Sequence, residues 1–206
     1  MQEVVIVDYG LCNLDSIARA IEECGARSFV TAKAADLDDA DKIVLPGVGS
    51  FRQAMANLTE AGFDRALPEA VCERQVPILG ICLGMHLMAQ SGSEGGDTAG
   101  LGLLSGDVKR MTPLESNSRV RLPHIGWNDV SPRPDFPLFD GIDEGTDFYF
   151  VHGYRVEGAD AEVLATVDYC GTTTASAGRD HVMAVQFHPE KSQTAGFRLL
   201  KNFLAY

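Results

Sequence analysis

The first half of the chain alternates short apolar runs with segments of helical periodicity. Positions 14, 17, 18 and 21 form one apolar helix face that ends at Gly25, and another face covers 51–58. Four apolar, partly β-branched runs fit buried strands, at 4–7, 28–31, 42–45 and 77–81. This alternation predicts an α/β fold whose central sheet is mostly parallel and is covered by helices on both faces.

The pattern changes after about residue 101, where glycine, proline and aspartate separate short strand-like stretches. Residues 178–180 fit a hairpin turn, and apolar residues at 197, 200, 203 and 204 mark a last helix. The strand-like stretches lie at 106–111, 125–130, 148–152, 163–167, 172–177 and 182–187. With no repeat or linker in the pattern, we expect a single domain over 1–206 with a β-rich C-terminal half.

Composition narrows the possible partners and the cellular compartment. The net charge of −12 and the pI near 4.7 argue against nucleic acid, since phosphate binding needs a basic surface. No apolar run approaches the roughly 20 residues that cross a bilayer, and no signal peptide is evident. The five cysteines are dispersed without metal-type spacing. We therefore expect a cytoplasmic protein with no membrane contact, no bound metal and no cofactor.

Residues 79–86, Leu-Gly-Ile-Cys-Leu-Gly-Met-His, place one cysteine where the strand at 77–81 meets a helical pattern. A strand that turns directly into a helix holds the turn residue in a strained conformation with its side chain clear of the sheet. Gly80 and Gly84 remove side chains that would collide across such a turn. Burial as a small hydrophobe is the commoner role of a cysteine, but these glycines favour a nucleophile at Cys82.

The segment 186–190, Gln-Phe-His-Pro-Glu, carries a histidine and a carboxylate two positions apart. Residues two apart in extended structure point to the same side, and Pro189 keeps the preceding residue extended. His188 and Glu190 can therefore face one cleft. Together with Cys82 they supply a nucleophile, a base and a group that orients the base.

A glycine-rich turn at 46–49, Pro-Gly-Val-Gly, directly follows the strand at 42–45. Attack on an amide carbonyl creates an oxyanion, which needs backbone N–H donors about 3 Å away. The turn exposes such donors, and the start of the helix after Cys82 can supply another. His152, in 151–154, fits a structural and a functional role about equally well.

Three of these segments, 80–84, 46–49 and 188–190, resemble the motifs of class I (triad-type) glutamine amidotransferases. Further segments are similar to the glutaminase subunits of imidazole glycerol phosphate synthases, one branch of that family. These segments are 8–10 with Asn13, 93–95, 123–128, 149–152 and 187–192. The resemblance spans nearly the whole chain, from 4 to 204.

The resemblance implies hydrolysis of glutamine through a γ-glutamyl thioester on Cys82, without a cofactor. The ammonia released would pass through a protected channel to a separate cyclase subunit, a (β/α)8 barrel that forms a heterodimer with the glutaminase. The pair would make imidazole glycerol phosphate in histidine biosynthesis.

The same resemblance implies roles for residues around the triad. Val48 would belong to the oxyanion strand, and Gly49 and Glu94 would help hold glutamine. The other residues expected at the oxyanion or the substrate are Gly47, Gly84, His86, Gly153 and Tyr154. Those expected on the side of the partner and the channel are Asn13, Trp127 and Tyr149.

Two positions depart from the family pattern. His86 stands where glutamine is usual, one helical turn after Cys82, and Gly153 stands where serine or threonine is usual. Both changes fall in the expected glutamine pocket, so they bear on substrate affinity more than on reaction type.

Three alternatives remain. The chain could be a paralogue that serves a related barrel synthase, for example in the amidination of a surface-polysaccharide sugar. It could be a non-catalytic scaffold for its partner. Cys82, His86 and His188 could also ligate a metal, because an i, i+4 pair on a helix has ligand-like spacing, although no second cysteine is near.

Overall fold

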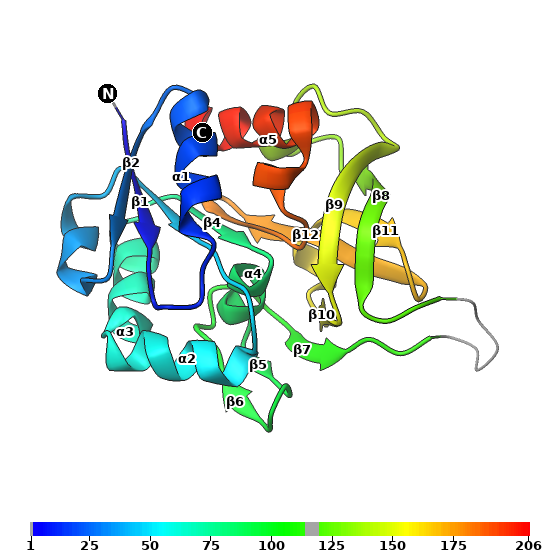
Figure 1. Ribbon diagram of the computed structural model, residues 1–206, viewed down its shortest axis with the longest axis horizontal. Helices are drawn as coiled ribbons and strands as arrows, with labels where there is room; N and C mark the ends of the chain where they lie inside the picture. The colour runs from blue at the N-terminus through cyan, green and yellow to red at the C-terminus, as the bar shows by residue number, and fades with distance from the viewer. Residues whose placement is uncertain (1, 114–119) are drawn as a thin grey trace.

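A single twisted sheet organises the computed structural model, which describes residues 2–113 and 120–206 (Figure 1). Within these residues the sheet has nine strands. In spatial order they are β2 (Arg27–Thr31), β1 (Glu3–Val7), β3 (Lys42–Leu45), β4 (Ile78–Ile81), β13 (Val182–Val185), β12 (Thr172–Arg179), β11 (Val163–Asp168), β8 (His124–Pro132) and β9 (Thr146–His152). Neighbours from β2 to β13 run parallel, and those from β13 to β9 run antiparallel.

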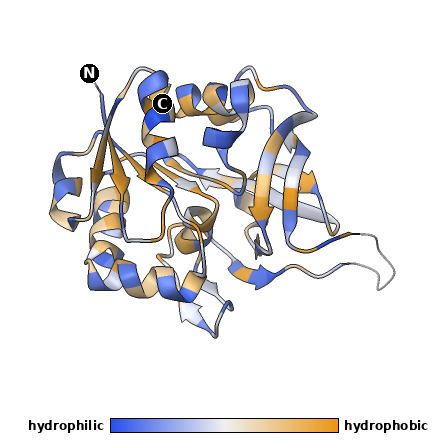
Figure 2. Ribbon diagram, viewed as in Figure 1, coloured by the Kyte–Doolittle hydropathy of each residue, from blue (hydrophilic) through white to orange (hydrophobic). Residues whose placement is uncertain are grey.

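Burial separates the two parts of the sheet in the way that the apolar pattern predicts. Every residue of β3, β4 and β13 is buried, as expected of strands covered on both faces. Strand β8 instead alternates exposed positions with buried or partly buried ones along its length. The hydrophobic residues concentrate on the central strands in Figure 2. The predicted α/β class and the β-rich second half are thus confirmed, and within this sheet the parallel pairing is confined to the stretch from β2 to β13.

Helices cover both faces of the parallel part, as predicted. Helices α1 and α5 pack over one face, while α2, α3 and α4 pack over the other (Figure 1). The α-helical bounds are α1 Leu14–Glu23, α2 Phe51–Glu60, α3 Phe63–Pro68, α4 Leu83–Met88 and α5 Gln193–Ala205. Shorter helical turns lie at Ala34–Asp39, Glu69–Glu73, Pro137–Phe139, Asp160–Glu162 and Pro189–Lys191. Among the described residues, no helix is long and apolar enough to cross a membrane.

A smaller sheet of four strands lies beside the main one, in the order β10, β7, β5, β6. Their bounds are β10 Tyr154–Glu157, β7 Asp107–Arg110, β5 Ser91–Gly92 and β6 Thr98–Ala99. The sequence predicted β7 but not the other three. Strands of two residues carry no readable alternation, and β10 follows β9 after a single residue, so the pattern offers no boundary between them.

Glycines let α4 pack closely against the sheet where β4 ends. A Cβ on Gly84 would lie 1.8 Å from the carbonyl oxygen of Leu45, at the end of β3. A Cβ on Gly80 would lie 2.5 Å from Sδ of Met88 and 3.0 Å from the backbone of Gly84. The predicted role, to avoid a collision across a sharp strand-to-helix turn, is confirmed for Gly80, whereas Gly84 instead avoids a collision with the neighbouring strand β3.

We predict that Gly84→Ala lowers the free energy of unfolding by about 3 kcal/mol, because the added methyl group meets a backbone oxygen that cannot move aside. Denaturant titration of both proteins measures this difference. Gly153→Ala is the matched control, since its Cβ would meet Pro123 at an ordinary 3.6 Å. Equal stability of the two variants would contradict the proposed packing role of Gly84.

Candidate active site

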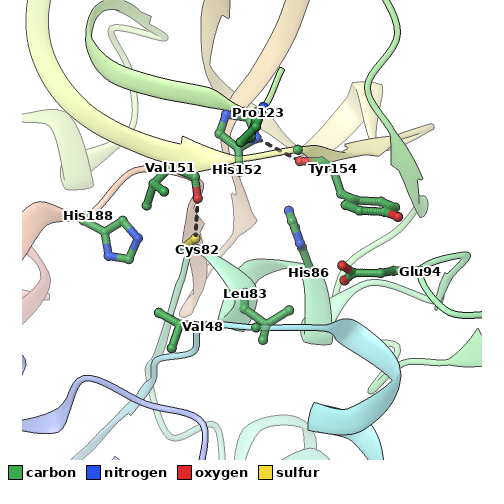
Figure 3. A pocket seen from close by; sticks show the side chains of 12 residues that line it. Val48, Cys82, Leu83, His86, Glu94, Pro123, Val151, His152, Tyr154 and His188 are labelled. Atoms are coloured by element: carbon green, nitrogen blue, oxygen red, sulfur yellow. Dashed lines mark hydrogen bonds between the residues drawn. The ribbon is translucent and has the colours of Figure 1, made fainter. Parts of the chain in front are cut away.

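Cys82 occupies the turn between β4 and α4 in a strained backbone conformation, with φ 55° and ψ −107°. A non-glycine residue in such a region costs on the order of 1–3 kcal/mol, which the surrounding packing must offset. Its backbone N–H donates to the carbonyl of Val185 at 2.8 Å, which joins the turn to β13. Its thiol donates to the carbonyl of Val151, with Sγ and O 3.8 Å apart (Figure 3). Cys82, the nucleophile predicted from the sequence, therefore lies in a strained turn.

His188 and Glu190 form a buried pair beside this turn. Nδ1 of His188 lies 2.8 Å from Oε1 of Glu190, and both side chains are almost fully buried. His188 is extended, as predicted, but Glu190 lies in the helical turn Pro189–Lys191 rather than in a strand. Within the described residues, Nε2 of His188 has no hydrogen-bond partner. Because Nδ1 is occupied by Glu190, Nε2 is the nitrogen available to exchange a proton.

The surroundings of His188 favour its charged form. Burial alone lowers the pKa of this imidazole, but interactions with Cys82 and then Glu190 outweigh burial and raise the pKa to about 9. His188 is thus a cation at neutral pH, with a sulfur on one side and a carboxylate on the other.

Cys82 and His188 open onto a cavity of about 290 Å³ (Figure 3). In Figure 3, His188 lies on one side of Cys82, and His86 and Glu94 lie on the other. The cavity is lined by Val48, Gly49, Cys82, Leu83, His86, Glu94, Pro123, Val151, His152, Gly153, Tyr154 and His188. Six of the eight residues that the resemblance places at the oxyanion or the substrate therefore line one cavity.

Gly47 and Gly84 are the two that do not line it. A Cβ on Gly47 would lie 2.0 Å from Oη of Tyr9 and 3.0 Å from Cβ of Leu83, so this glycine allows close packing behind the loop. Gly84 faces the end of β3, as described above. Glu94 lines the cavity and also accepts the backbone N–H of Phe51 at 2.8 Å, which caps the start of α2.

One backbone N–H of the 46–49 turn already donates a hydrogen bond to another segment of the protein. The N–H of Val48 donates to the carbonyl of Leu11 at 2.8 Å. Tyr9 donates its hydroxyl to the carbonyl of Pro46 at 2.8 Å, and Gly49 has φ 102°. The Val48 N–H, a predicted oxyanion donor, is therefore already engaged.

His86 is buried in the wall of the cavity and is hydrogen-bonded to Gln186, for which the sequence pattern predicts no role. Its Nε2 lies 2.7 Å from Oε1 of Gln186, the residue after β13. Burial lowers the pKa of His86 to about 4, and the contact with Gln186 only partly opposes this shift. The imidazole is therefore neutral at physiological pH.

His152, which lines the cavity, is hydrogen-bonded to a second histidine, His124, which does not. Nδ1 of His152 donates to the carbonyl of Tyr154 at 2.8 Å, so Nε2 of His152 accepts from Nδ1 of His124, 3.0 Å away. Burial lowers the pKa of His152 to about 3 and that of His124 to about 4. The ring of His124 stacks on Tyr169 and Phe150, with centroids 3.7 and 4.7 Å apart. These neutral histidines support the cavity wall.

Two of the three residues expected to face a partner, Trp127 and Tyr149, lie on the antiparallel part of the sheet. Trp127 is 47% exposed and contacts Tyr149 on the paired strand, with ring centroids 6.0 Å apart. Ile125, on the same strand, is 59% exposed, which is unusual for a large apolar side chain. Asn13 is exposed at the N-cap of α1 but makes no side-chain capping bond.

Two residues of the site, Gln186 and Leu11, are not predicted from the sequence. Gln186 could have been found, because the two-residue alternation that linked His188 to Glu190 also links it to Gln186. The contact from Leu11 could not, since a backbone carbonyl leaves no trace in side-chain identity. Within the described part of the chain, no three His, Cys, Asp or Glu side chains are grouped so as to hold a metal.

Comparison with known proteins places this geometry in a family. The family model of class-I glutamine amidotransferases matches residues 5–205. The chain is 46% identical over 201 residues to imidazole glycerol phosphate synthase subunit HisH 1 of Campylobacter jejuni strain RM1221, covering 98% of both chains. It is 45% identical over 205 residues to subunit HisH of Moorella thermoacetica, covering 98% of this chain and 94% of the relative.

The fold also resembles a solved structure of low sequence similarity. The structure of PurLQS from Thermotoga maritima superposes with a TM-score of 0.77 at 21% identity, covering 100% of this chain and 98% of that one. Together with the match over 5–205 and the cysteine turn beside a His–Glu pair, these findings show that the chain belongs to the class-I glutamine amidotransferase family.

Proposed function

We propose that this chain is the glutaminase subunit of an imidazole glycerol phosphate synthase in histidine biosynthesis, formed as one domain over 1–206 and acting in the cytoplasm. The observation that carries the proposal is a strained cysteine beside a buried His–Glu pair at the wall of a cavity. Near-complete coverage of HisH relatives at 45–46% identity supports the choice of branch.

The first half of the reaction transfers the glutamyl group to sulfur. Sγ of Cys82, its proton passed to His188, attacks the side-chain carbonyl carbon of glutamine, and a C–S bond forms as the carbonyl electrons move to oxygen. When the tetrahedral intermediate collapses, the C–N bond breaks and Nε2 of His188 gives its proton to the leaving nitrogen. The raised pKa of His188 suits it to hold that proton until ammonia departs.

The second half returns the enzyme to its starting state. A water molecule attacks the thioester carbonyl while the now neutral His188 accepts a proton from it. The C–S bond then breaks, releasing glutamate and the thiolate of Cys82. Glu190 keeps the imidazole in one orientation through both halves, since it holds Nδ1 at 2.8 Å.

The cavity offers suitable groups for the rest of the substrate. Glutamine carries an α-ammonium group, which the carboxylate of Glu94 in the cavity lining can bind. Gly49, Gly153 and Tyr154 line the same space and leave room for the aliphatic chain. The absence of a side chain at Gly153 removes a potential hydroxyl contact, so we expect binding to depend on the remaining groups.

The engaged N–H of Val48 supports control by a partner. An oxyanion donor that is hydrogen-bonded to Leu11 cannot stabilise the tetrahedral intermediate, so the free subunit is catalytically weak. We propose that a (β/α)8-barrel cyclase subunit, loaded with its own substrate, releases this donor. The exposed Ile125 and Trp127 supply an apolar surface of the kind that such a partner covers.

A second candidate keeps the chemistry and changes the acceptor. His86 and Gly153, the two departures from the family pattern, support a paralogue that feeds a related barrel synthase, for example one that amidinates a sugar. Copurification with each candidate barrel, followed by glutamine turnover with each acceptor, separates the two. A third candidate, a non-catalytic scaffold, requires that glutamine is not hydrolysed with any partner.

We predict that a substrate-loaded cyclase partner raises glutamate formation by about 100-fold over the isolated chain, the effect of supplying one oxyanion donor. Enzymatic measurement of glutamate over time tests this expectation. Cys82→Ala is the control: it abolishes turnover, while complex formation by size-exclusion chromatography remains. Turnover in Cys82→Ala would overturn the triad, and equal rates with and without the partner would overturn the coupling.

We also predict an alkaline limit on activity. As pH rises through about 9, His188 loses the proton that it gives to ammonia, so kcat/KM falls by about tenfold per pH unit above the midpoint. Glu190→Gln removes one cause of the raised pKa and should move this midpoint to lower pH. Profiles of kcat/KM between pH 6 and 10 provide the measurement, and an unchanged midpoint in Glu190→Gln would contradict the role of the carboxylate.

A further inference from the structure

Gln186 lies behind the cavity and contacts two residues of the site. Its side chain is fully buried, and its backbone N–H donates to the carbonyl of Ala175 at 2.8 Å. Oε1 of its amide lies 2.7 Å from Nε2 of His86, and Nε2 of its amide lies 4.0 Å from Sγ of Cys82. The amide therefore connects His86 to the nucleophile, although Gln186 does not line the cavity.

The orientation of this amide sets the sign of the partial charge that faces the sulfur. With the amide N–H toward Cys82, the positive end of a dipole faces Sγ and stabilises negative charge on it. If the amide were reversed, the carbonyl oxygen would face Sγ and oppose that charge. The carbonyl of Val151 also contacts the sulfur, but a carbonyl only accepts hydrogen bonds and so cannot stabilise negative charge on Sγ.

His86 determines which orientation is stable. A neutral imidazole has one N–H, and when that hydrogen is on Nε2, it donates to Oε1 of Gln186. The carbonyl end of the amide is then occupied, and the N–H end is left for Cys82. Burial keeps His86 neutral at physiological pH, because its pKa is lowered to about 4.

We propose that His86 and Gln186 are positioning residues for the nucleophile: His86 holds the carbonyl end of the Gln186 amide, so that the amide N–H faces Sγ of Cys82 and stabilises the thiolate. Negative charge develops on Sγ when the sulfur attacks glutamine and returns when the thioester is hydrolysed, so the pair can act in both halves of the reaction. The catalytic meaning of this pair rests on the proposed glutaminase function, whereas its effect on the thiol does not.

The test is the rate at which iodoacetamide alkylates Cys82 in the full chain as a function of pH. Peptide mass spectrometry follows Cys82 separately from the other four of the five cysteines. Gln186→Leu removes the amide and keeps a similar volume. We expect it to slow alkylation at neutral pH by about tenfold and to move the midpoint of the profile upward by about one pH unit, as loss of a hydrogen bond to a charged group predicts.

Ser176→Ala is the matched control, because Ser176 is also fully buried and donates one hydrogen bond, from β12 to the carbonyl of Ala184 on β13 at 2.7 Å. It should leave the alkylation profile unchanged. Coincident profiles for Gln186→Leu and the wild type would overturn the proposal, and so would equal slowing by Ser176→Ala.

Variants of His86 decide the question if Gln186→Leu fails to fold by circular dichroism. His86→Gln keeps an N–H donor toward Oε1 of Gln186, whereas His86→Phe removes it. We expect near wild-type alkylation in His86→Gln and slower alkylation in His86→Phe, and equal rates in the two would overturn the proposal.

Glutamine turnover with the cyclase partner adds a second readout. Gln186→Leu should lower kcat and leave KM nearly unchanged, since the side chain lies outside the cavity lining. If alkylation of Cys82 follows the expected profiles but the wild-type chain hydrolyses no glutamine, the proposed function is wrong. The positioning role of His86 and Gln186 is then retained. An altered KM with an unchanged kcat would count against the pair.

Discussion

The strained backbone at Cys82 is the constraint on which the rest of the site depends. A residue held at φ 55° and ψ −107° relaxes unless its neighbours prevent it. Here a hydrogen bond to β13 fixes the start of the turn, and the contact of Gly84 with the end of β3 fixes the helix that follows. The same two strands position the other parts of the chemistry, because the 46–49 loop follows β3, and Gln186 and His188 follow β13. One packing arrangement therefore brings three segments together at one site.

The groups around that cavity shift the pKa values of its histidines in opposite directions and so give them different roles. His188 is buried but has a thiol and a carboxylate beside it, and its pKa is raised to about 9. His86 and His152 are buried to a similar degree beside uncharged partners, and burial lowers the pKa of each, to about 4 and 3. The charge of each imidazole at neutral pH thus follows from its neighbours rather than from its depth, so one ring can exchange protons while the other two shape the wall.

Local patterns in the sequence were enough to predict the parallel strands, the helices α1, α2, α4 and α5, and the cysteine turn, but not α3. Gly80 and Gly84 predicted the turn correctly, because close packing restricts residue type directly. The pattern did not predict that Glu190 lies in a helical turn, and it did not predict the four-stranded sheet. It also could not predict that the Val48 N–H is bonded to Leu11, since 37 residues separate the two and the contact uses only backbone atoms. The pair of His86 and Gln186 joins positions 100 apart for which only the fold provides the link.

The place of β13 in the sheet has a consequence for the order of assembly during synthesis. This strand comes from 182–185 near the end of the chain, yet it lies between β4 and β12 and pairs with both. Until the ribosome has released those residues, β4 lacks one neighbour and the turn at Cys82 lacks its hydrogen bond to Val185. His188 and Glu190 emerge later still. A nascent chain therefore lacks the hydrogen-bonded turn and the His–Glu pair for most of its synthesis, and the site forms only when residues as far as Glu190 are in place.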